Sequence, residues 1–253
     1  MEVFVRYYYA EHEAAYRRLQ QEGMTQWNDL FEESRPDDFE AFSNRAFLEH
    51  ILPRLNLPSP SEVDVLEYGC GTGLTACFLA AQGFQVDAFD LIPEAITLAR
   101  RFAQQRGIEV TFGVQDVCAL ADEPVRKQYD LIVDSYCLQS IVTDADRAAL
   151  FAAVRARLKR DGYYLISTAT YEPDRIYEPG FRHDTTTGIC YEEVPPAGSR
   201  QDAVEIDGTW YRPHRRHLPP TALRDELVHA GFQVVSQQGP FKGNITCLRA
   251  DAP

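Results

Sequence analysis

Hydrophobic and polar residues along the middle of the chain follow two periods in turn, one typical of short strands and one typical of helices. Val65 to Tyr68 is a run of strand-forming residues, and the apolar residues after Gly73 fall at helical spacing. The change of period recurs until about Thr168, which predicts a parallel sheet covered by helices on both faces. The later strands of this region are expected at Gln85 to Phe89, Glu109 to Val114, Asp130 to Val133 and Tyr163 to Thr168.

The first sixty residues predict helices rather than strands. Residues 7–22 are rich in helix formers and carry an apolar stripe along one face. A second helix is expected from about Asp38 to Leu55, before the sequence Pro58-Ser59-Pro60 breaks the chain. We expect residues 1–60 to form a helical lid.

The alternation of strands and helices stops after Thr168. Residues 169–218 contain proline, glycine and aromatic residues, and Asp207-Gly208 lies between two strand-forming runs, which is a strong hairpin signal. We therefore expect a β-rich cap that is inserted into the core and contacts the substrate.

The pattern of the core resumes after the insertion. A helix is expected from Pro220 to His229, followed by strands at Phe232 to Ser236 and Asn244 to Arg249. The short link between these strands suits an antiparallel pair at an edge of the sheet. Residues 61–168 and 219–253 therefore form one α/β core of the Rossmann-like, doubly wound type.

Composition and charge narrow the classes of function. The chain has 253 residues, is 45% hydrophobic and carries a formal net charge of −13, which argues against binding to nucleic acid. It has no run of about 18 apolar residues and no signal-peptide pattern, so we expect a cytoplasmic protein that does not bind membranes, as a monomer or a homodimer. Its six cysteines are scattered, which predicts free thiols and no metal site.

The sequence Glu67-Tyr68-Gly69-Cys70-Gly71-Thr72-Gly73 has the form of a nucleotide-cofactor site, although a glycine-rich turn also fits an ordinary tight turn. In the dinucleotide fingerprint the third glycine follows the second by three residues, whereas Gly71 and Gly73 are two apart. Glu67 would repel a pyrophosphate but attract an ammonium or sulfonium group. S-adenosylmethionine carries both of these cations.

Four acidic residues follow or end the predicted strands of the core: Glu67, Asp90, Asp116 and Asp134. Open α/β sheets bind ligands at the carboxyl ends of their parallel strands, so we expect these acids to gather on one rim. Asp90 comes about twenty residues after Gly69, where an acid that binds ribose is expected in a nucleotide-binding unit. Asp134 also fits a simpler role as a loop-capping residue.

With this motif and these acids, residues 63–168 and 220–249 resemble the class I S-adenosylmethionine-dependent methyltransferases, in particular those that act on small molecules and natural products. The resemblance implies a seven-stranded, mostly parallel sheet whose last strand is antiparallel. It also implies S-adenosyl-L-methionine as cofactor, S-adenosyl-L-homocysteine as product, and contacts from the glycine motif to the methionine and ribose, from Asp90 to the ribose hydroxyls and from Asp116 to the adenine amine. The implied cofactor-binding residues are Glu67, Gly69, Cys70, Gly71, Gly73, Asp90, Leu91, Asp116, Val117, Asp134 and Ser135.

Residues outside the motif are candidates for contact with the methyl acceptor. His214 and His217 precede the return of the core and can take a proton near neutral pH, or they can simply orient the loop. Together with Tyr16 they are our catalytic candidates. Arginine side chains of the cap can bind carboxylates in a bidentate manner, although most surface arginines are only solvated. The candidate substrate-contacting residues are Trp27, Tyr136, Arg175, Arg182, Trp210 and Arg212.

These observations favour a methyltransferase that acts on an oxygen or nitrogen atom of a small molecule or a modified peptide, carboxylates included. Methyl transfer from a sulfonium is a direct displacement, so the protein has to align the reacting atoms and exclude water. A protein that binds S-adenosylmethionine without transferring its methyl group is the alternative, and a nicotinamide oxidoreductase is the third hypothesis.

Overall fold

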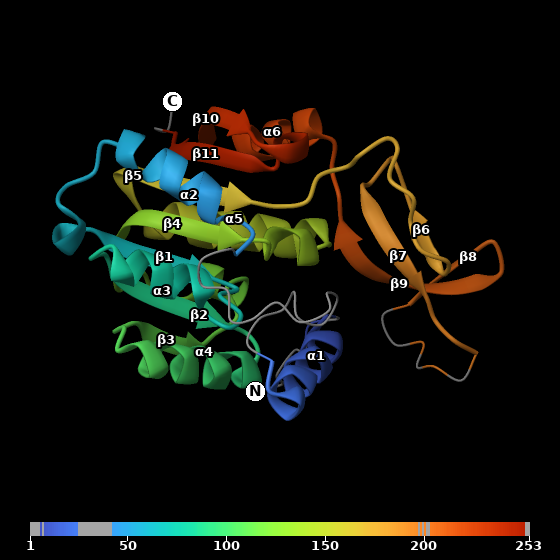
Figure 1. The fold of residues 1–253 in the computed structure, drawn as a ribbon. Helices are drawn as coiled ribbons and strands as arrows, with labels where there is room; N and C mark the ends of the chain where they lie inside the picture. Colours follow the sequence, from blue (N-terminus) through green and yellow to red (C-terminus); the bar gives the residue numbers. More distant parts are fainter. Residues whose placement is uncertain are drawn as a thin grey trace.

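The computed structural model of the protein describes residues 6, 8–24, 42–196, 198, 200 and 203–250. Trp27, a candidate for contact with the substrate, lies outside these residues, and so does the expected start of the second helix near Asp38. The described residues form a large mixed α/β core and a smaller antiparallel sheet at its side (Figure 1).

The large sheet has seven strands in the order β10-β11-β5-β4-β1-β2-β3, with the strand of the glycine motif, β1, near its middle. β1 pairs in parallel with β2 and β4, whereas β11 runs antiparallel to both β5 and β10. This arrangement confirms the predicted mostly parallel sheet with an antiparallel last strand. The strands are β1 (Asp64–Tyr68), β2 (Gln85–Asp90), β3 (Thr111–Val114), β4 (Tyr129–Ser135), β5 (Leu158–Ser167), β10 (Phe232–Gln238) and β11 (Asn244–Arg249).

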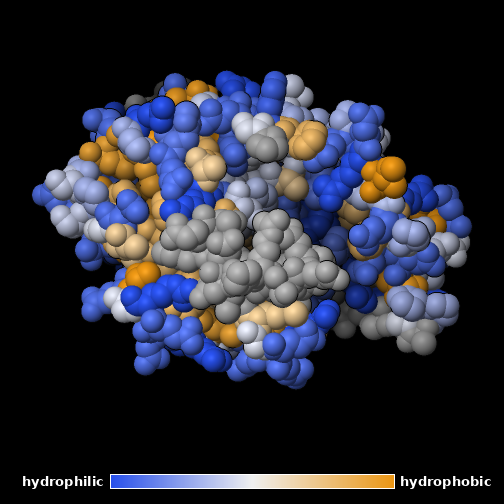
Figure 2. Space-filling view, viewed as in Figure 1, coloured by the Kyte–Doolittle hydropathy of each residue, from blue (hydrophilic) through white to orange (hydrophobic). Residues whose placement is uncertain are grey.

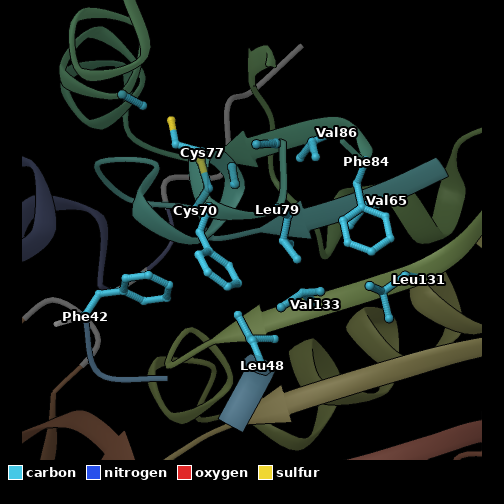
Figure 3. Packing of buried hydrophobic residues seen from close by; sticks show 14 of the residues in the cluster. Phe42, Leu48, Val65, Cys70, Cys77, Leu79, Phe84, Val86, Leu131 and Val133 are labelled. Carbon is cyan, nitrogen blue, oxygen red and sulfur yellow. The ribbon is translucent and has the colours of Figure 1, made fainter. Parts of the chain in front are cut away.

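Helices cover both faces of the sheet. Side chains of α2, α3 and α4 pack on one face around Val65, and those of α5 and α6 pack on the other around Leu66. On the first face, Leu48 of α2 lies next to Val133 of β4 (Figure 3). The described helices are α1 (Tyr9–Glu22), α2 (Arg45–Ile51), α3 (Leu74–Ala81), α4 (Pro93–Arg106), α5 (Asp144–Arg157) and α6 (Pro220–His229). Short 3-10 turns are η2 (Leu52–Arg54), η3 (Pro60–Glu62), η4 (Ala119–Asp122), η5 (Leu138–Ser140) and η6 (Pro240–Lys242).

The second predicted helix is shorter than we expected. α2 ends at Ile51, and the chain continues as the 3-10 turn η2, which contains Pro53. Proline has no backbone N–H and clashes with the preceding turn, so the α-helix does not continue to Leu55. Residues 42–44 precede α2 without helical geometry, and Asn44 is its N-cap residue.

The inserted region forms the smaller sheet, which we call the cap sheet. Its strands are β6 (Phe181–His183), β7 (Ile189–Glu193), β8 (Val204–Ile206) and β9 (Thr209–Arg216), in the order β6-β7-β9-β8. Asp207 and Gly208 join β8 to β9 and both have positive φ, as a two-residue type I′ turn requires, which confirms the predicted hairpin. The cap sheet lies at the carboxyl side of the core strands, and α1 is placed between it and α4 (Figure 1).

Three expectations from the sequence concern cysteine pairing, metal binding and membrane-spanning helices. The six cysteines are all described and none is paired in a disulfide. Within the described ranges, no cluster of three or more His, Cys, Asp or Glu side chains is arranged to hold a metal ion. No described helix has both the length and the apolar character needed to cross a membrane.

Candidate active site

A cavity of about 530 Å³ opens at the carboxyl ends of β1, β2 and β4. Its described lining comes from these strands, the first turn of α3, the loop after β4, α1, the residues before α2, and β9. Residues 69–72 of the glycine loop (residues 69–73) also line it. The surface between the core and the cap sheet is hollowed and mainly hydrophilic (Figure 2). A second, larger hollow of about 750 Å³ lies near Gln85, Arg100 and Lys127, on the β2–β3 side, and contains none of the glycine loop. The motif residues therefore single out the smaller cavity, whose volume suits a small-molecule site.

The glycine loop needs glycine for its conformation and for its close contacts. Gly69, Gly71 and Gly73 all have positive φ, at 58°, 55° and 81°. A Cβ on Gly69 would lie 2.3 Å from the Cys137 Sγ, and one on Gly71 would lie 2.8 Å from the Tyr16 hydroxyl. The loop after β4 and helix α1 therefore press directly against this turn.

Glu67 is a buried carboxylate at the inner end of the cavity. It is 1% exposed, and neither of its oxygens has a hydrogen-bond partner in the part of the chain that the structure describes. Burial raises the pKa of Glu67 to about 8, and the nearby Ser135 and Ala76 groups lie close without reaching hydrogen-bonding geometry. An unpaired buried carboxylate is costly, and a ligand with a positive charge would compensate it.

Asp90 stands at the end of β2 on the rim of the same cavity. Its two oxygens accept hydrogen bonds from the backbone amides of Gly71, at 2.8 Å, and Ile92, at 2.9 Å. Burial nevertheless raises its pKa to about 6. Asp90 therefore ties the glycine loop to the neighbouring strand and presents its carboxylate beside the loop, as the sequence predicted.

A ring of three polar side chains lies beside Glu67 and was not anticipated from the sequence. Asn44 Nδ2 donates to Ser135 Oγ (3.0 Å), Ser135 Oγ donates to Thr75 Oγ1 (3.0 Å), and Thr75 Oγ1 donates to Asn44 Oδ1 (3.2 Å). All three residues line the cavity. The ring connects the start of α2, the first turn of α3 and the end of β4. The available sequence signals were the position of Asn44 before a helix and of Thr75 just after the glycine loop.

Asp134 does not line the cavity. Its Oδ1 accepts hydrogen bonds from the amides of Cys137 (3.0 Å) and Leu138 (3.1 Å), and the residue is completely buried. Alternation along β4 turns Ser135 toward the cavity and Asp134 toward the opposite face of the sheet. The geometry of Asp134 is that of a residue that caps the loop after β4.

The predicted adenine-binding residues are not among the residues that line the cavity. Asp116 Oδ2 forms an ion pair with Arg6 Nε at 2.7 Å, and its Oδ1 accepts from the Cys118 amide at 2.9 Å. Arg6 also pairs with Asp146. Val117 is buried in the α5–α6 side of the core. Arg6, three residues before the start of α1, thus contacts the acid that the resemblance assigns to adenine. Leu91 packs in the small cluster between α1 and α4.

Helix α1 connects the core to the cap sheet across the cavity. Tyr8, which precedes the helix, and His12 and Tyr16 recur every four residues and all line the cavity. Tyr16 packs against α4 beside Ile92, and Arg17 Nε forms an ion pair with Glu94 at 3.0 Å. The tyrosine therefore lies at the cofactor end, against the glycine loop.

The other side of α1 is held by the cap sheet. Glu11 lies 3.3 Å from Arg215 Nη2 and 3.4 Å from His214 Nδ1, both on β9. Burial alone would raise the pKa of Glu11, but the two cationic or donor groups lower it to about 2. Core, α1 and cap sheet thus enclose one cavity.

Residues 39–237 match a family model described as a methyltransferase domain. The chain belongs to this methyltransferase family. The ubiquinone biosynthesis O-methyltransferase of Xanthomonas axonopodis pv. citri is 31% identical over 159 residues, which are 56% of this chain and 64% of that protein. The namesake from Xylella fastidiosa strain M23 is 36% identical over 126 residues, or 49% of this chain and 48% of that protein. The chain thus spans less than two thirds of the length of each of these relatives.

Solved structures share the fold of this chain. The CcbJ methyltransferase from Streptomyces caelestis has a TM-score of 0.61 and 16% identity, with 90% of this chain and 97% of that chain covered. The glycopeptide N-methyltransferase MtfA, solved in complex with S-adenosyl-L-methionine, has a TM-score of 0.55 and 22% identity, with 85% and 97% covered. The seven-stranded sheet is therefore the class I methyltransferase fold, as the glycine motif predicted.

The predicted catalytic histidines are absent from the described lining of the cavity. His217 is 4% exposed, stacks on Tyr177 with ring centroids 6.3 Å apart, and has its Nδ1 3.4 Å from the Tyr177 hydroxyl. Burial lowers its pKa to about 3. His214 faces Glu11 instead. Of the three catalytic candidates, only Tyr16 lines the cavity.

The four predicted substrate-contacting residues in the cap are also absent from the cavity lining. Arg175 lies over the Tyr177 ring (5.4 Å), Arg182 pairs with Asp207 (2.7 Å), and Trp210 lies under Arg200 (4.7 Å). Arg212 is on β9, where it is paired in register with Glu192. None of these four residues is among the described residues that line the cavity.

Tyr136 is the predicted substrate-contacting residue that does line the cavity. It has a φ of 63°, which is uncommon for a residue other than glycine, and its amide donates to the Ser167 carbonyl at 2.7 Å. Such strained residues cluster at functional sites. The lining also includes His12 and Arg215, two residues with chemistry that sequence reasoning did not select for this place.

Proposed function

We propose that this protein transfers the methyl group of S-adenosyl-L-methionine to an oxygen or nitrogen atom of a small organic molecule or a modified peptide, carboxylates included. The observation that carries the proposal is the buried, unpaired carboxylate of Glu67 beside the glycine loop. A ligand that brings both an ammonium and a sulfonium suits this anion, whereas a pyrophosphate would be repelled by it. The family match supports the same reaction.

The residues of the cavity fit this cofactor. The backbone of Gly69 and Gly71 allows the ligand to approach closely, and Glu67 would hold its positive end. Gly73 does not line the cavity, because it packs against Ala99 and Phe112 of the core. The Asp90 oxygens each use one backbone hydrogen bond, so each retains a lone pair for a ribose hydroxyl. When bound, the cofactor supplies an electrophilic methyl group on a positively charged sulfur.

The protein contributes alignment and exclusion of water. Tyr8 and Tyr16 cover the cavity from α1, and Tyr136 and Cys137 border it from the loop after β4. Holding the acceptor in line with the methyl group turns a bimolecular step into a nearly unimolecular one. In this proposal the aromatic side chains form a pocket in which the reacting atoms meet away from bulk solvent.

The names of similar proteins point to small acceptors and differ in the atom that is methylated. The curated relatives are named as O-methyltransferases of ubiquinone biosynthesis, whereas MtfA is named as a glycopeptide N-methyltransferase. These names support a small-molecule or peptide acceptor for this chain and leave both oxygen and nitrogen in the proposal.

Calorimetry and a methyl-transfer assay test the proposal together. We expect the protein to bind S-adenosyl-L-methionine more tightly than NAD or NADP, and to release S-adenosyl-L-homocysteine when a suitable acceptor from a panel of phenols, hydroxy acids, amines and peptides is present. Tight binding without transfer to any acceptor would favour the alternative of a binding protein. Stronger binding of the nicotinamide nucleotides would overturn the cofactor assignment.

A further inference from the structure

The charged side chains are unevenly distributed along the cavity. Glu67 and Asp90 stand at the end formed by the core strands, whereas Arg215 of β9 lines the side formed by the cap sheet. The Arg215 side chain is only 12% exposed. The acidic end suits the cationic cofactor, so the positively charged side is the part of the cavity that faces the acceptor.

Arg215 is held in one orientation. Its Nη1 donates to the His214 carbonyl at 2.9 Å, and its Nη2 lies 3.3 Å from Glu11 Oε1. A guanidinium has five N–H donors, so these contacts leave others that can bind a planar anion such as a carboxylate. A fixed, largely buried guanidinium on a cavity wall is a built site for an anionic oxygen group.

His12 lines the cavity one helical turn before Tyr16, which lies against the glycine loop. Its ring contacts Tyr8, with centroids 5.6 Å apart. Burial, followed by the charges of Arg215 and His214, lowers the pKa of His12 to about 4, and Glu11 opposes them. The imidazole is therefore neutral at pH 7 and has a lone pair that can accept a proton.

We propose that the acceptor carries a hydroxyl group together with an anionic oxygen group, that Arg215 binds the anionic group, and that His12 accepts the hydroxyl proton. This inference rests on the proposed methyl transfer and names its acceptor class. The hydroxyl proton passes to His12, the oxygen forms the new bond to the methyl carbon, and the methyl–sulfur bond breaks with its electron pair left on sulfur. A protonated amine would be repelled by Arg215, which favours oxygen over nitrogen as the methylated atom.

The bound anion also prepares His12 for its role. Arg215 disfavours the imidazolium in the empty cavity, and a carboxylate next to Arg215 offsets that effect. A bound carboxylate therefore offsets one of the charges that lower the pKa of His12, whereas the larger effect of burial remains.

Binding of matched probe pairs tests the role of Arg215. Each pair consists of an acid and its amide, and the three acids are 3,4-dihydroxybenzoate, salicylate and 4-hydroxyphenylacetate. Their binding is measured by calorimetry on the protein saturated with S-adenosyl-L-homocysteine. We expect at least one acid to bind about tenfold or more tightly than its amide, the scale of one charge-assisted hydrogen bond. Arg215→Ala should abolish the difference, Arg215→Lys should keep part of it, and Arg18→Ala, on the exposed side of α1, should leave it intact. Equal binding within every pair, or a preference that survives Arg215→Ala, would overturn the proposal.

The role of His12 is tested by turnover and by a spectroscopic signal. His12→Ala and His12→Gln should lower kcat on the preferred hydroxy acid by about 10²–10⁴-fold, the range for a lost general base, without weakening S-adenosyl-L-homocysteine binding. The loss of kcat in these variants should be smaller for a nitro-substituted, more acidic analogue. The phenolate absorbance of 4-hydroxy-3-nitrobenzoate bound to either variant should be lower than when it is bound to the wild type. His229→Ala is the control. Unchanged kcat in both variants would overturn this role alone, whereas absence of transfer to any acceptor by the wild type would overturn the proposed function.

Discussion

At the scale of single residues, the main feature of the cavity is one carboxyl group, Glu67, that the described residues leave without a cationic or hydrogen-bonding partner. Glu67 is buried and its pKa is raised to about 8, yet the fold places it beside a glycine loop with no described partner. Such an arrangement stabilises a bound cation at the expense of the ligand-free protein. Two predictions separate these effects.

The affinity for S-adenosyl-L-methionine should depend on the ionisation of Glu67. Because the positive ligand favours the carboxylate, binding releases the proton that Glu67 holds below its pKa of about 8. Affinity should therefore rise with pH, by up to about tenfold per unit, and level off near pH 8. Calorimetry in buffers of different ionisation enthalpy measures the released proton. Glu67→Gln should bind weakly and lose this part of the pH dependence; an identical dependence in the variant would contradict the assignment.

The same carboxylate should destabilise the ligand-free protein at higher pH. The folded state raises the pKa of Glu67 from 4.5 to about 8, so its protonation stabilises the fold fully below about pH 4.5, and this contribution is lost as the pH rises to 8. Across that window the loss is about 1.4 kcal/mol per pH unit at most. Urea unfolding of Glu67→Gln and wild type at pH 5 and pH 8.5 should show the variant gaining in relative stability at the higher pH. A constant difference would mean that Glu67 is already ionised in the folded state.

At the scale of elements, the decisive contact is that of α1 with the glycine loop. The Tyr16 hydroxyl stands 2.8 Å from where a Cβ on Gly71 would be, whereas its ring carbon Cζ is 3.8 Å away. A helix distant in sequence therefore limits the residue that the loop can contain. The conformational requirement for glycine and the steric one can be measured separately.

Gly71→Ala should destabilise the protein by about 1–2 kcal/mol for the left-handed backbone and by a further amount for the clash with Tyr16. Tyr16→Phe removes the clashing hydroxyl, so the double variant should recover about 0.5–3 kcal/mol, the usual range for residues in contact. Gly107→Ala is the matched control, because φ is 63° there and no atom lies within 4 Å of an added Cβ. A coupling between Gly71 and Tyr16 no larger than that between Gly107 and Tyr16 would show that α1 does not rest on the loop.

Prediction from sequence worked best where structure is local. The strands and helices of the core follow from periodicity, and the hairpin at Asp207-Gly208 follows from turn chemistry. β4 shows why it was harder to predict from the sequence which side chains point toward the cavity. Ile132 and Val133 are both buried, so the strand has no polar face to indicate that Ser135, and not Asp134, turns to the cavity.

In the cap sheet it was even harder to predict from the sequence which side chains share a face. Pairing of β7 with β9 shifts register between Cys190 and Tyr191, so that Tyr191 faces Pro213 and Cys190 faces Arg215. A bulge changes which residues share a face, and the pattern of polar and apolar residues in β9 does not predict this bulge. The sequence therefore indicated that cap arginines can bind an anion but named Arg175, Arg182 and Arg212, whereas Arg215 lines the cavity.

At the scale of the whole molecule, the cavity exists only where three parts of the chain meet. The core supplies Glu67 and Asp90, α1 supplies His12 and Tyr16, and the cap sheet supplies Arg215. The ion pair of Arg17 with Glu94 fixes α1 to the core, and the contacts of Glu11 fix it to β9. Ion pairs of this kind contribute about 1 kcal/mol or less each, so the link between α1 and the cap sheet is weak, whereas the packing of Tyr16 and Leu19 against α4 also holds α1 to the core.

Product binding should therefore stabilise α1 and β9 together with the glycine loop. S-adenosyl-L-homocysteine at 100 times its Kd adds about 2.7 kcal/mol to the free energy of unfolding, which should raise Tm by about 5–10 °C for a chain of this size. Amide hydrogen exchange should slow in residues 9–22 and near Arg215 as well as in residues 69–73, because α1 closes the cavity from the core to the cap. Glu11→Gln weakens the link to the cap, so protection near Arg215 should fall in this variant while protection of residues 69–73 is kept. Protection confined to residues 69–73 in the wild type would show that α1 and the cap sheet do not respond to the occupant of the cavity.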